Sequence, residues 1–260
     1  MTISNIIAGF GVGAAVGMTG VGGGSLMTPI LVLAFGYAPV TAVGTDLWFA
    51  AITKMVGGTL HQRRGTVDWE VLRRLSLGSL PAAIATLTWM HATGTGQSKQ
   101  GLIVHALGLV LLLTAVVMLA RRKLQSIGAR LRTTTPEAFK KVQPPLTVLA
   151  GAILGVLVSL TSVGAGALGT VMLLYLYPLR MNPSRLVGTD IVHAIPLTVV
   201  AGTGYLLMGD VDLALLGNLL LGSIPGILVG TLIASRAPEN LTRSAIALIL
   251  AGVSSKLLLT

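Results

Sequence analysis

The chain has 260 residues, of which 53% are hydrophobic and only 10% are charged, and its net charge is +10. Soluble globular domains carry about 25% charged residues, so this composition excludes an ordinary soluble protein. The charge does not indicate a nucleic-acid partner either. Seven of the 18 basic residues fall in one segment, 121–141, aromatic residues are few, and no pattern of alternating basic and aromatic residues occurs. Basic clusters beside apolar helices instead indicate how a membrane protein is oriented.

The first apolar segment begins close to the N-terminus. Ile3–Val21 is long enough to cross a hydrocarbon core of about 30 Å, which needs roughly 20 residues as a helix. Met1–Phe10 contains no Lys or Arg and so lacks the positive region of a cleavable signal peptide. We expect it to be the first membrane segment of the mature protein. Gly101–Ala120 and Leu186–Leu207 also qualify by length, and the 33 glycines suit closely packed membrane helices.

The sequence matches itself when it is shifted by 144 residues. From Pro39 to Pro81, 18 of 43 gapless positions are identical to their counterparts, and Val43-Gly44-Thr45-Asp46 falls on Val187-Gly188-Thr189-Asp190. A two-residue gap then aligns Val21–Gly24 with Val163–Gly166. The chain is therefore a duplication. It divides into a first membrane repeat, a basic connecting loop and a second membrane repeat, at 1–121, 122–145 and 146–260.

Each copy contains five apolar segments, of which the first two are short and joined by glycines. This pattern predicts an all-α membrane bundle of about 8–10 segments, some of them short helices broken at glycine. The glycine-joined pair is either two spans or one hairpin that turns inside the membrane. The predicted segments are 3–20, 24–36, 39–61, 68–91 and 101–121, then 146–162, 165–178, 183–207, 212–235 and 241–259.

The loop between the third and fourth segments is basic in the first copy only. Its four arginines and their uncharged counterparts are Arg63, Arg64, Arg73 and Arg74 against Leu207, Met208, Gly217 and Asn218. The positive-inside rule places loops 61–74 and 121–145 in the cytoplasm and both termini outside. The two copies are then inverted, as in many transporters whose substrate site lies at mid-membrane between the repeats.

These residues resemble the sulfite exporter TauE/SafE family, also called the toluene-sulfonate uptake permease family. The similarity is carried by Gly20-Val21-Gly22-Gly23-Gly24 with Pro29, by Val43–Asp46, and by their echo in the second half. It covers nearly the whole chain. It implies a permease for sulfite, organosulfonates or related sulfur-containing anions, which we expect in a bacterial inner membrane. The second copy departs from the pattern, because Ala165 replaces Gly23 and Val171 stands where Pro29 would be.

The two glycine turns are the first candidate site. Irregular backbone at membrane depth is tolerated only inside protein or beside a cavity. A helix that begins after such a turn directs free N–H groups and the positive end of its dipole toward that cavity, which suits an anion. The alternative is that the glycines only allow close helix packing. The residues predicted to bind substrate here are Gly22, Gly23, Gly24, Gly164 and Gly166.

Two carboxylates, Asp46 and Asp190, lie inside apolar segments, and each follows a threonine, Thr45 or Thr189. Ionisable groups are costly in lipid and therefore mark functional positions. We predict that the threonines contact substrate. For the carboxylates two roles stay open: coupling transport to protons, or a structural role such as satisfying backbone amides at a broken helix.

Lys54 is a basic residue that lies well inside an apolar segment, and it is predicted to contact an anionic substrate. It could instead extend to the membrane interface or pair with Asp46. His193 follows Asp190 by three residues and shares its helix face. The two could form a proton relay, or His193 could simply be hydrogen-bonded within the bundle.

The chain contains no Cys, no Walker motif and no HExxH motif, so the sequence predicts neither an enzyme nor a metal or cofactor site. We expect a secondary transporter with alternating access around a central anion site, with protons as a candidate coupling ion and membrane lipids as its surroundings. An anion channel fits the same topology, and a membrane-embedded enzyme or an assembly subunit fits it less well.

Overall fold

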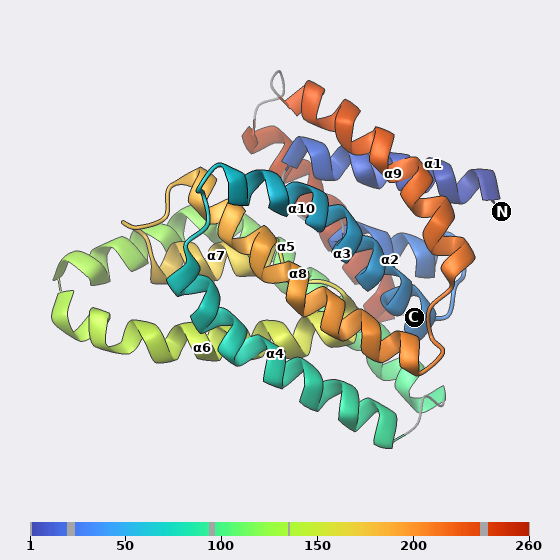
Figure 1. The fold of residues 1–260 in the computed structure, drawn as a ribbon, viewed down its shortest axis with the longest axis horizontal. Helices are drawn as coiled ribbons and strands as arrows, with labels where there is room; N and C mark the ends of the chain where they lie inside the picture. Colours follow the sequence, from blue (N-terminus) through green and yellow to red (C-terminus); the bar gives the residue numbers. More distant parts are fainter. Residues whose placement is uncertain (1, 20–23, 94–96, 135, 235–238, 260) are drawn as a thin grey trace.

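The computed structural model describes residues 2–19, 24–93, 97–134, 136–234 and 239–259, and every regular element in these ranges is an α-helix. This confirms the all-α prediction. The helices, drawn in Figure 1, are α1 (Thr2–Thr19), α2 (Gly24–Leu33), α3 (Pro39–Arg63), α4 (Trp69–Ala92), α5 (Gln97–Thr134), α6 (Pro136–Thr161), α7 (Ala167–Leu176), α8 (Pro183–Leu207), α9 (Leu213–Ala234) and α10 (Glu239–Leu259).

Several of these helices have the length and composition of membrane spans. In the described part of the chain, 4 helices are long and apolar enough to cross a bilayer: Gln100–Thr133, Phe139–Thr161, Pro183–Leu207 and Leu213–Gly230. Helices α2 and α7 have only 10 residues each. At 1.5 Å per residue they reach about 15 Å, or half of a hydrocarbon core. They are short helices of the kind that the glycine turns predict.

The basic segment between the two copies differs from the prediction of a loop over 122–145. Helix α5 continues to Thr134 and α6 begins at Pro136, and the two extensions project together at the left of Figure 1. Arg, Lys, Leu, Gln and Ala, which are frequent here, are good helix formers, so the helix continues past its apolar part. The extension also packs on the bundle, because a Cβ atom at Gly128 would lie 2.3 Å from the Tyr175 carbonyl oxygen.

The main helix contacts join one copy to the other. Helix α1 packs on α9 and α6 packs on α4, while α3 packs on α8 and α5 on α10. The packing of α1 on α9 repeats that of α6 on α4 with the copies exchanged. A Cβ atom at Gly78 would lie 1.9 Å from the Val148 carbonyl oxygen, and one at Gly222 would lie 1.9 Å from that of Ile6. Glycine at these positions lets the two backbones touch, which is the small-residue packing of membrane helices.

Replacing Gly78 with Ala should therefore lower the free energy of unfolding by about 1–3 kcal/mol, the usual cost of overpacking, because backbone must move to admit the methyl group. Gly217 in α9 is a matched control, since a Cβ atom there meets nothing within 4 Å. Gly217→Ala should be neutral or slightly stabilising, because Ala favours the helix. The measurement is the melting temperature of each purified variant in detergent, compared between Gly78→Ala and Gly217→Ala. Equal melting temperatures would contradict the close contact of α4 with α6.

Two matching hydrogen bonds set the direction of the central helices α3 and α8. The Asp212 backbone N–H donates to Thr45 Oγ1 at 3.1 Å, and the Asp68 backbone N–H donates to Thr189 Oγ1 at 2.9 Å. Because Asp68 follows the end of α3 and Asp212 follows the end of α8, each helix begins beside the end of the other. The two helices are therefore antiparallel, and they lie side by side in Figure 1. Inverted copies would give this arrangement; their inversion across a membrane stays a prediction.

Candidate functional site

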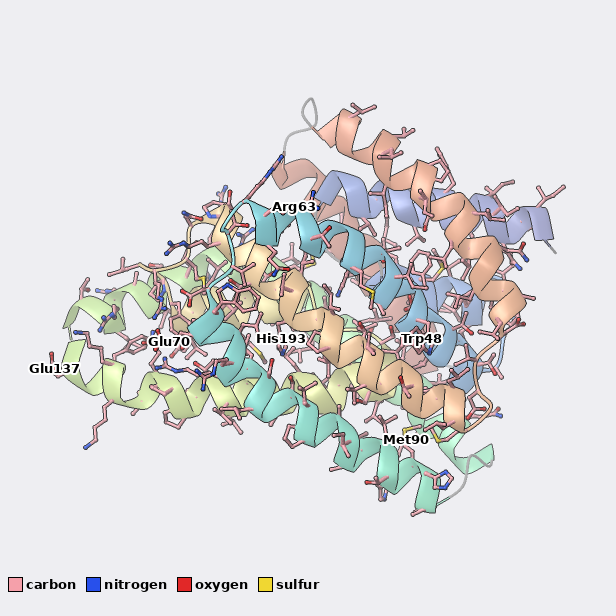
Figure 2. The ribbon with its side chains drawn as sticks, viewed as in Figure 1. Trp48, Arg63, Glu70, Met90, Glu137 and His193 are labelled. Carbon is pink, nitrogen blue, oxygen red and sulfur yellow. The ribbon has the colours of Figure 1, made fainter. Side chains whose placement is uncertain are left out.

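A buried group of polar side chains lies where α3 and α8 pass the short helices α2 and α7. Asp46, Lys54 and Asp190 are 0%, 8% and 4% exposed, and His193 is completely buried. Figure 2 places His193 in the middle of the bundle, between Glu70 toward one end and Met90 toward the other. The structure thus brings together four of the residues that the sequence singles out: Asp46, Lys54, Asp190 and His193.

Lys54 joins the two copies at the centre of this group. Its ammonium group donates a hydrogen bond of 3.0 Å to the carbonyl oxygen of Ala165, which belongs to the second glycine turn. It is also close enough to Asp46 and Asp190 to attract both carboxylates. The side chain therefore points into the bundle and does not extend to the membrane interface.

The second glycine turn is a sharp reversal inside the bundle. Helix α6 ends at Thr161, and α7 begins at Ala167. Between them the φ angles are 59° at Ser162, 125° at Gly164 and 139° at Gly166. Tyr177, just past the end of α7, bonds to Thr147 in the middle of α6 at 2.8 Å. Helix α7 therefore runs back along α6. For this copy α6 and α7 form a hairpin, and a turn of that hairpin inside the membrane stays a prediction.

The start of α7 has the features of an anion site. Residues 161–170 are all buried, and no side chain caps the helix at Gly166. The first N–H groups of a helix carry a partial positive charge and need acceptors. Lys54 adds a full positive charge beside them. In the first copy, Gly22 and Gly23 lie outside the described residues, and Gly24 is the first residue of α2.

The two carboxylates make different contacts. Thr28 of α2 donates a hydrogen bond to Asp46 Oδ2, and Oδ1 has no hydrogen-bond partner among the described residues. Asp190 Oδ1 also lacks a hydrogen bond there, and it lies against α7, since a Cβ atom at Gly169 would be 2.3 Å from it. Each carboxylate thus touches the short helix of its own copy. Unfilled acceptor capacity in a buried group is rare and leaves room for a proton or a ligand donor.

His193 bonds to a residue that the sequence analysis did not select. Its Nε2 atom and Ser79 Oγ of α4 are 2.9 Å apart, while Nδ1 has no hydrogen-bond partner among the described residues. This geometry supports the interpretation of a histidine hydrogen-bonded within the bundle. Lys54 exerts its charge on His193 as well, so the imidazole belongs to the same electrostatic group.

Thr45 and Thr189 have structural partners. Each hydroxyl accepts the backbone N–H at the start of a helix of the other copy, as described above. They therefore join α3 to the start of α9 and α8 to the start of α4. Substrate contact by these threonines stays a prediction.

Sequence reasoning missed Thr28, Ser79 and Ser162. Signals for the first two exist, because the two-residue gap that aligns the glycine turns also puts Thr28 on Thr170, and Ser79 falls on Ser223. Ser162 carries no such signal. It has a left-handed backbone, which is unusual for a residue other than glycine, and it adjoins the Asp46 carboxyl group. Only the fold reveals that position.

The two ends of the bundle are closed differently. At one end Arg180 donates to both Asp68 carboxylate oxygens, at 2.6 and 2.8 Å, and to Glu70 at 2.7 Å. At the other end Asp212 caps α9 through Leu215, and the stretch that matches Arg180 is Gly36-Tyr37-Ala38, without charge. Bidentate arginine–carboxylate pairs are the strong kind of ion pair. Within the described ranges, the end with Arg180 is therefore held together by more ionic contacts than the end with Asp212.

Asp210, in the loop between α8 and α9, gives a prediction on pH dependence. Its Oδ2 atom is buried without a hydrogen bond among the described residues, and burial raises the pKa of its carboxyl group. A pKa raised by folding means that the folded chain binds more protons, so stability falls as pH rises above the unfolded-state pKa of about 3.9. Asp210→Asn should thus raise the melting temperature near neutral pH, and the gain should shrink as pH approaches 4.

The exposed Glu137, replaced by Gln, controls for the lost charge in this experiment. Melting curves in detergent over a pH series measure both variants. If Asp210→Asn melts at a lower temperature than the unmodified protein near neutral pH, the unfavourable burial of that carboxylate is contradicted.

In the part of the chain that the structure describes, no group of three or more His, Cys, Asp and Glu residues could hold a metal ion.

Comparison with known proteins adds to this geometry. The family described as Sulfite exporter TauE/SafE matches residues 5–257. The chain is 39% identical over 223 residues to the probable membrane transporter protein YjnA of Bacillus subtilis, with 84% of each chain covered. It is 28% identical over 243 residues to YdhB of the same organism, also named a probable membrane transporter protein, with 94% of each covered. No solved structure matches the chain.

Proposed function

This chain belongs to the sulfite exporter TauE/SafE family and is a multi-pass membrane transporter, and from that premise we propose that it moves small sulfur-containing anions such as sulfite or organosulfonates across a bacterial inner membrane. The observation that carries the proposal is the meeting of Lys54 with the start of α7. A full cation and a helix N-terminus together attract one compact anion. In this proposal one of Asp46 and Asp190 is ionised and balances Lys54, and the other is protonated.

The proposed mechanism is alternating access between two closed ends. The buried centre has to open to one side at a time, because its polar groups are out of contact with solvent. We place the moving contacts at the hydrogen bonds of Thr189 with Asp68 and of Thr45 with Asp212. Equivalent bonds at the two ends suit a molecule whose halves exchange roles around one site. The end with Arg180 and the basic α5–α6 extension is the cytoplasmic one in this proposal.

Flux measurements test the substrate class. Purified protein in proteoliposomes should take up radiolabelled sulfite, or an organosulfonate such as taurine, saturably and with counterflow from an internal pool of the same anion. Flux that never saturates and shows no counterflow would instead support a channel. Chemical change of the substrate would support a membrane-embedded enzyme. Absence of flux for every sulfur-containing anion tested would refute the proposed substrate class.

Proton coupling belongs to the same proposal and needs its own measurement. We expect that Asp46→Asn or Asp190→Asn makes uptake insensitive to an imposed pH gradient, because an amide cannot exchange a proton at that position. Glu137→Gln, at the exposed start of α6 outside the central group, controls for the loss of one carboxylate. Unchanged pH dependence in both central variants would remove the coupling role and leave the structural one.

A further inference from the structure

A basic cavity opens on the surface of the bundle away from the central site. It has a volume of about 480 Å³ and lies between the start of α4, the α5–α6 extensions and the residues after α7. Four cationic side chains and one carboxylate line it: Arg74, Arg132, Lys140, Arg180 and Glu70. Arg180 and Arg74 are held in place by hydrogen bonds with Glu70 and Tyr177. The cavity is therefore a preformed pocket for an anionic group.

An apolar surface continues from this cavity along α4. A second hollow of about 410 Å³ shares Glu70 and Arg74 with the basic cavity and is otherwise lined by Trp69, Arg73 and Leu77. A third, of about 360 Å³, shares Arg73 and Leu77 with the second and extends to Leu80 and Pro81. Trp69 and Leu77 are exposed on this face. The three hollows thus form one path from a basic pocket to an apolar strip on the outside of the bundle.

The composition of this path matches the layers of a bilayer. Trp and Arg occur typically at the level of lipid headgroups, and exposed Leu faces the acyl chains. The anionic headgroups of a leaflet attract basic pockets between transmembrane helices. A free anion would use the pocket alone, whereas a phospholipid joins a phosphate to an acyl chain and would fill the whole path.

We propose that this path is a binding site for an acidic phospholipid, with its phosphate in the pocket lined by Arg132 and Lys140 and one acyl chain along Leu77 and Leu80 of α4. The site is separate from the central group and does not depend on which substrate the protein moves. A lipid there would link the α5–α6 extension to α4 and to Arg180, and so would stabilise the end of the bundle that Arg180 fastens.

Native mass spectrometry of the purified full-length protein tests the site with three probes. These are dioleoyl phosphatidylglycerol, dioleoyl phosphatidylcholine, and glycerol 3-phosphate, the headgroup without chains. Phosphatidylglycerol should bind more tightly than the other two. The double variant Arg132→Gln/Lys140→Gln should weaken its binding by about 30-fold, since each Lys or Arg near an anionic headgroup contributes roughly fivefold.

The matched control is Lys123→Gln/Lys141→Gln. It removes the same two charges from α5 and α6, and neither residue lines the cavity. This control should bind phosphatidylglycerol within about twofold of the unmodified protein, because a charge outside the pocket adds little. Equal weakening in both double variants, or equal binding of phosphatidylcholine, would overturn the proposal. Glycerol 3-phosphate binding as tightly as phosphatidylglycerol would reassign the pocket to a soluble anion and overturn the lipid assignment.

Discussion

Replacing Lys54 with Met should reduce sulfur-anion uptake by about 10- to 100-fold at limiting substrate, because a hydrogen bond from a charged group contributes about 1.5–3 kcal/mol. Lys54 is the cation that faces the start of α7, where its ammonium bonds to Ala165. Without it, an anion would meet two buried carboxylates and lose its main attraction. The measurement is the half-saturation constant of uptake in proteoliposomes, corrected for the amount of folded protein.

Loss of Lys54 can also impair folding, since removing one partner of a buried charge group costs about 3–5 kcal/mol. The double variant Lys54→Met/Asp190→Asn separates the two effects, because it removes a carboxylate that the cation attracts. We expect it to recover much of the melting temperature and none of the uptake. Lys123→Met on the exposed part of α5 controls for the loss of a lysine. A folded Lys54→Met variant with an unchanged half-saturation constant would contradict the proposed site.

Replacing Gly166 with Ala should reduce uptake by at least about tenfold, which corresponds to about 1.4 kcal/mol of lost binding. Gly166 has a φ of 139°, a conformation that L side chains rarely adopt, and it stands directly before α7. A side chain there costs about 1–3 kcal/mol of backbone strain, and relief of that strain moves the start of the helix away from Lys54.

Gly36 provides a matched control for strain alone. It also has a positive φ, of 70°, and a Cβ atom there meets nothing within 4 Å. It lies in the connection between α2 and α3, outside the central group. Gly36→Ala should lower the melting temperature to a similar extent and leave uptake per folded molecule unchanged. If both alanine variants lose uptake equally, the backbone at Gly166 has no special role in binding.

Much of the fold was predictable because the sequence features that indicate it depend on neighbouring residues. Apolar length indicates helices, and the repeat of Val43–Asp46 at Val187–Asp190 indicates two related copies. The short length of α2 and α7 follows from glycines that interrupt apolar stretches. The loop prediction for 122–145 was wrong for an equally local reason. Charge ends the apolar stretch of α5 but not the helix, because Arg and Lys are good helix formers.

The candidate site was predictable in its members but not in its pairings. Asp46, Lys54, Asp190 and His193 stood out because charge inside an apolar segment is costly. Their neighbours depend on contacts between residues far apart in the chain, such as Ser79 with His193 and Thr28 with Asp46. The repeat matches Thr28 with Thr170 and Ser79 with Ser223, but it matches many other residues as well. The sequence therefore did not reveal which of the matched residues contact the charged group.

The sequence by itself determined that this protein is a duplicated helical membrane protein with glycine turns and a few buried charges, because composition and periodicity depend only on neighbouring residues. Only the tertiary structure decided that Lys54 of one copy reaches the turn of the other. It also decided that Thr45 and Thr189 fasten opposite ends of an antiparallel pair of helices. The physical reason is that these contacts join residues more than 100 positions apart, where their geometry depends on how whole helices pack.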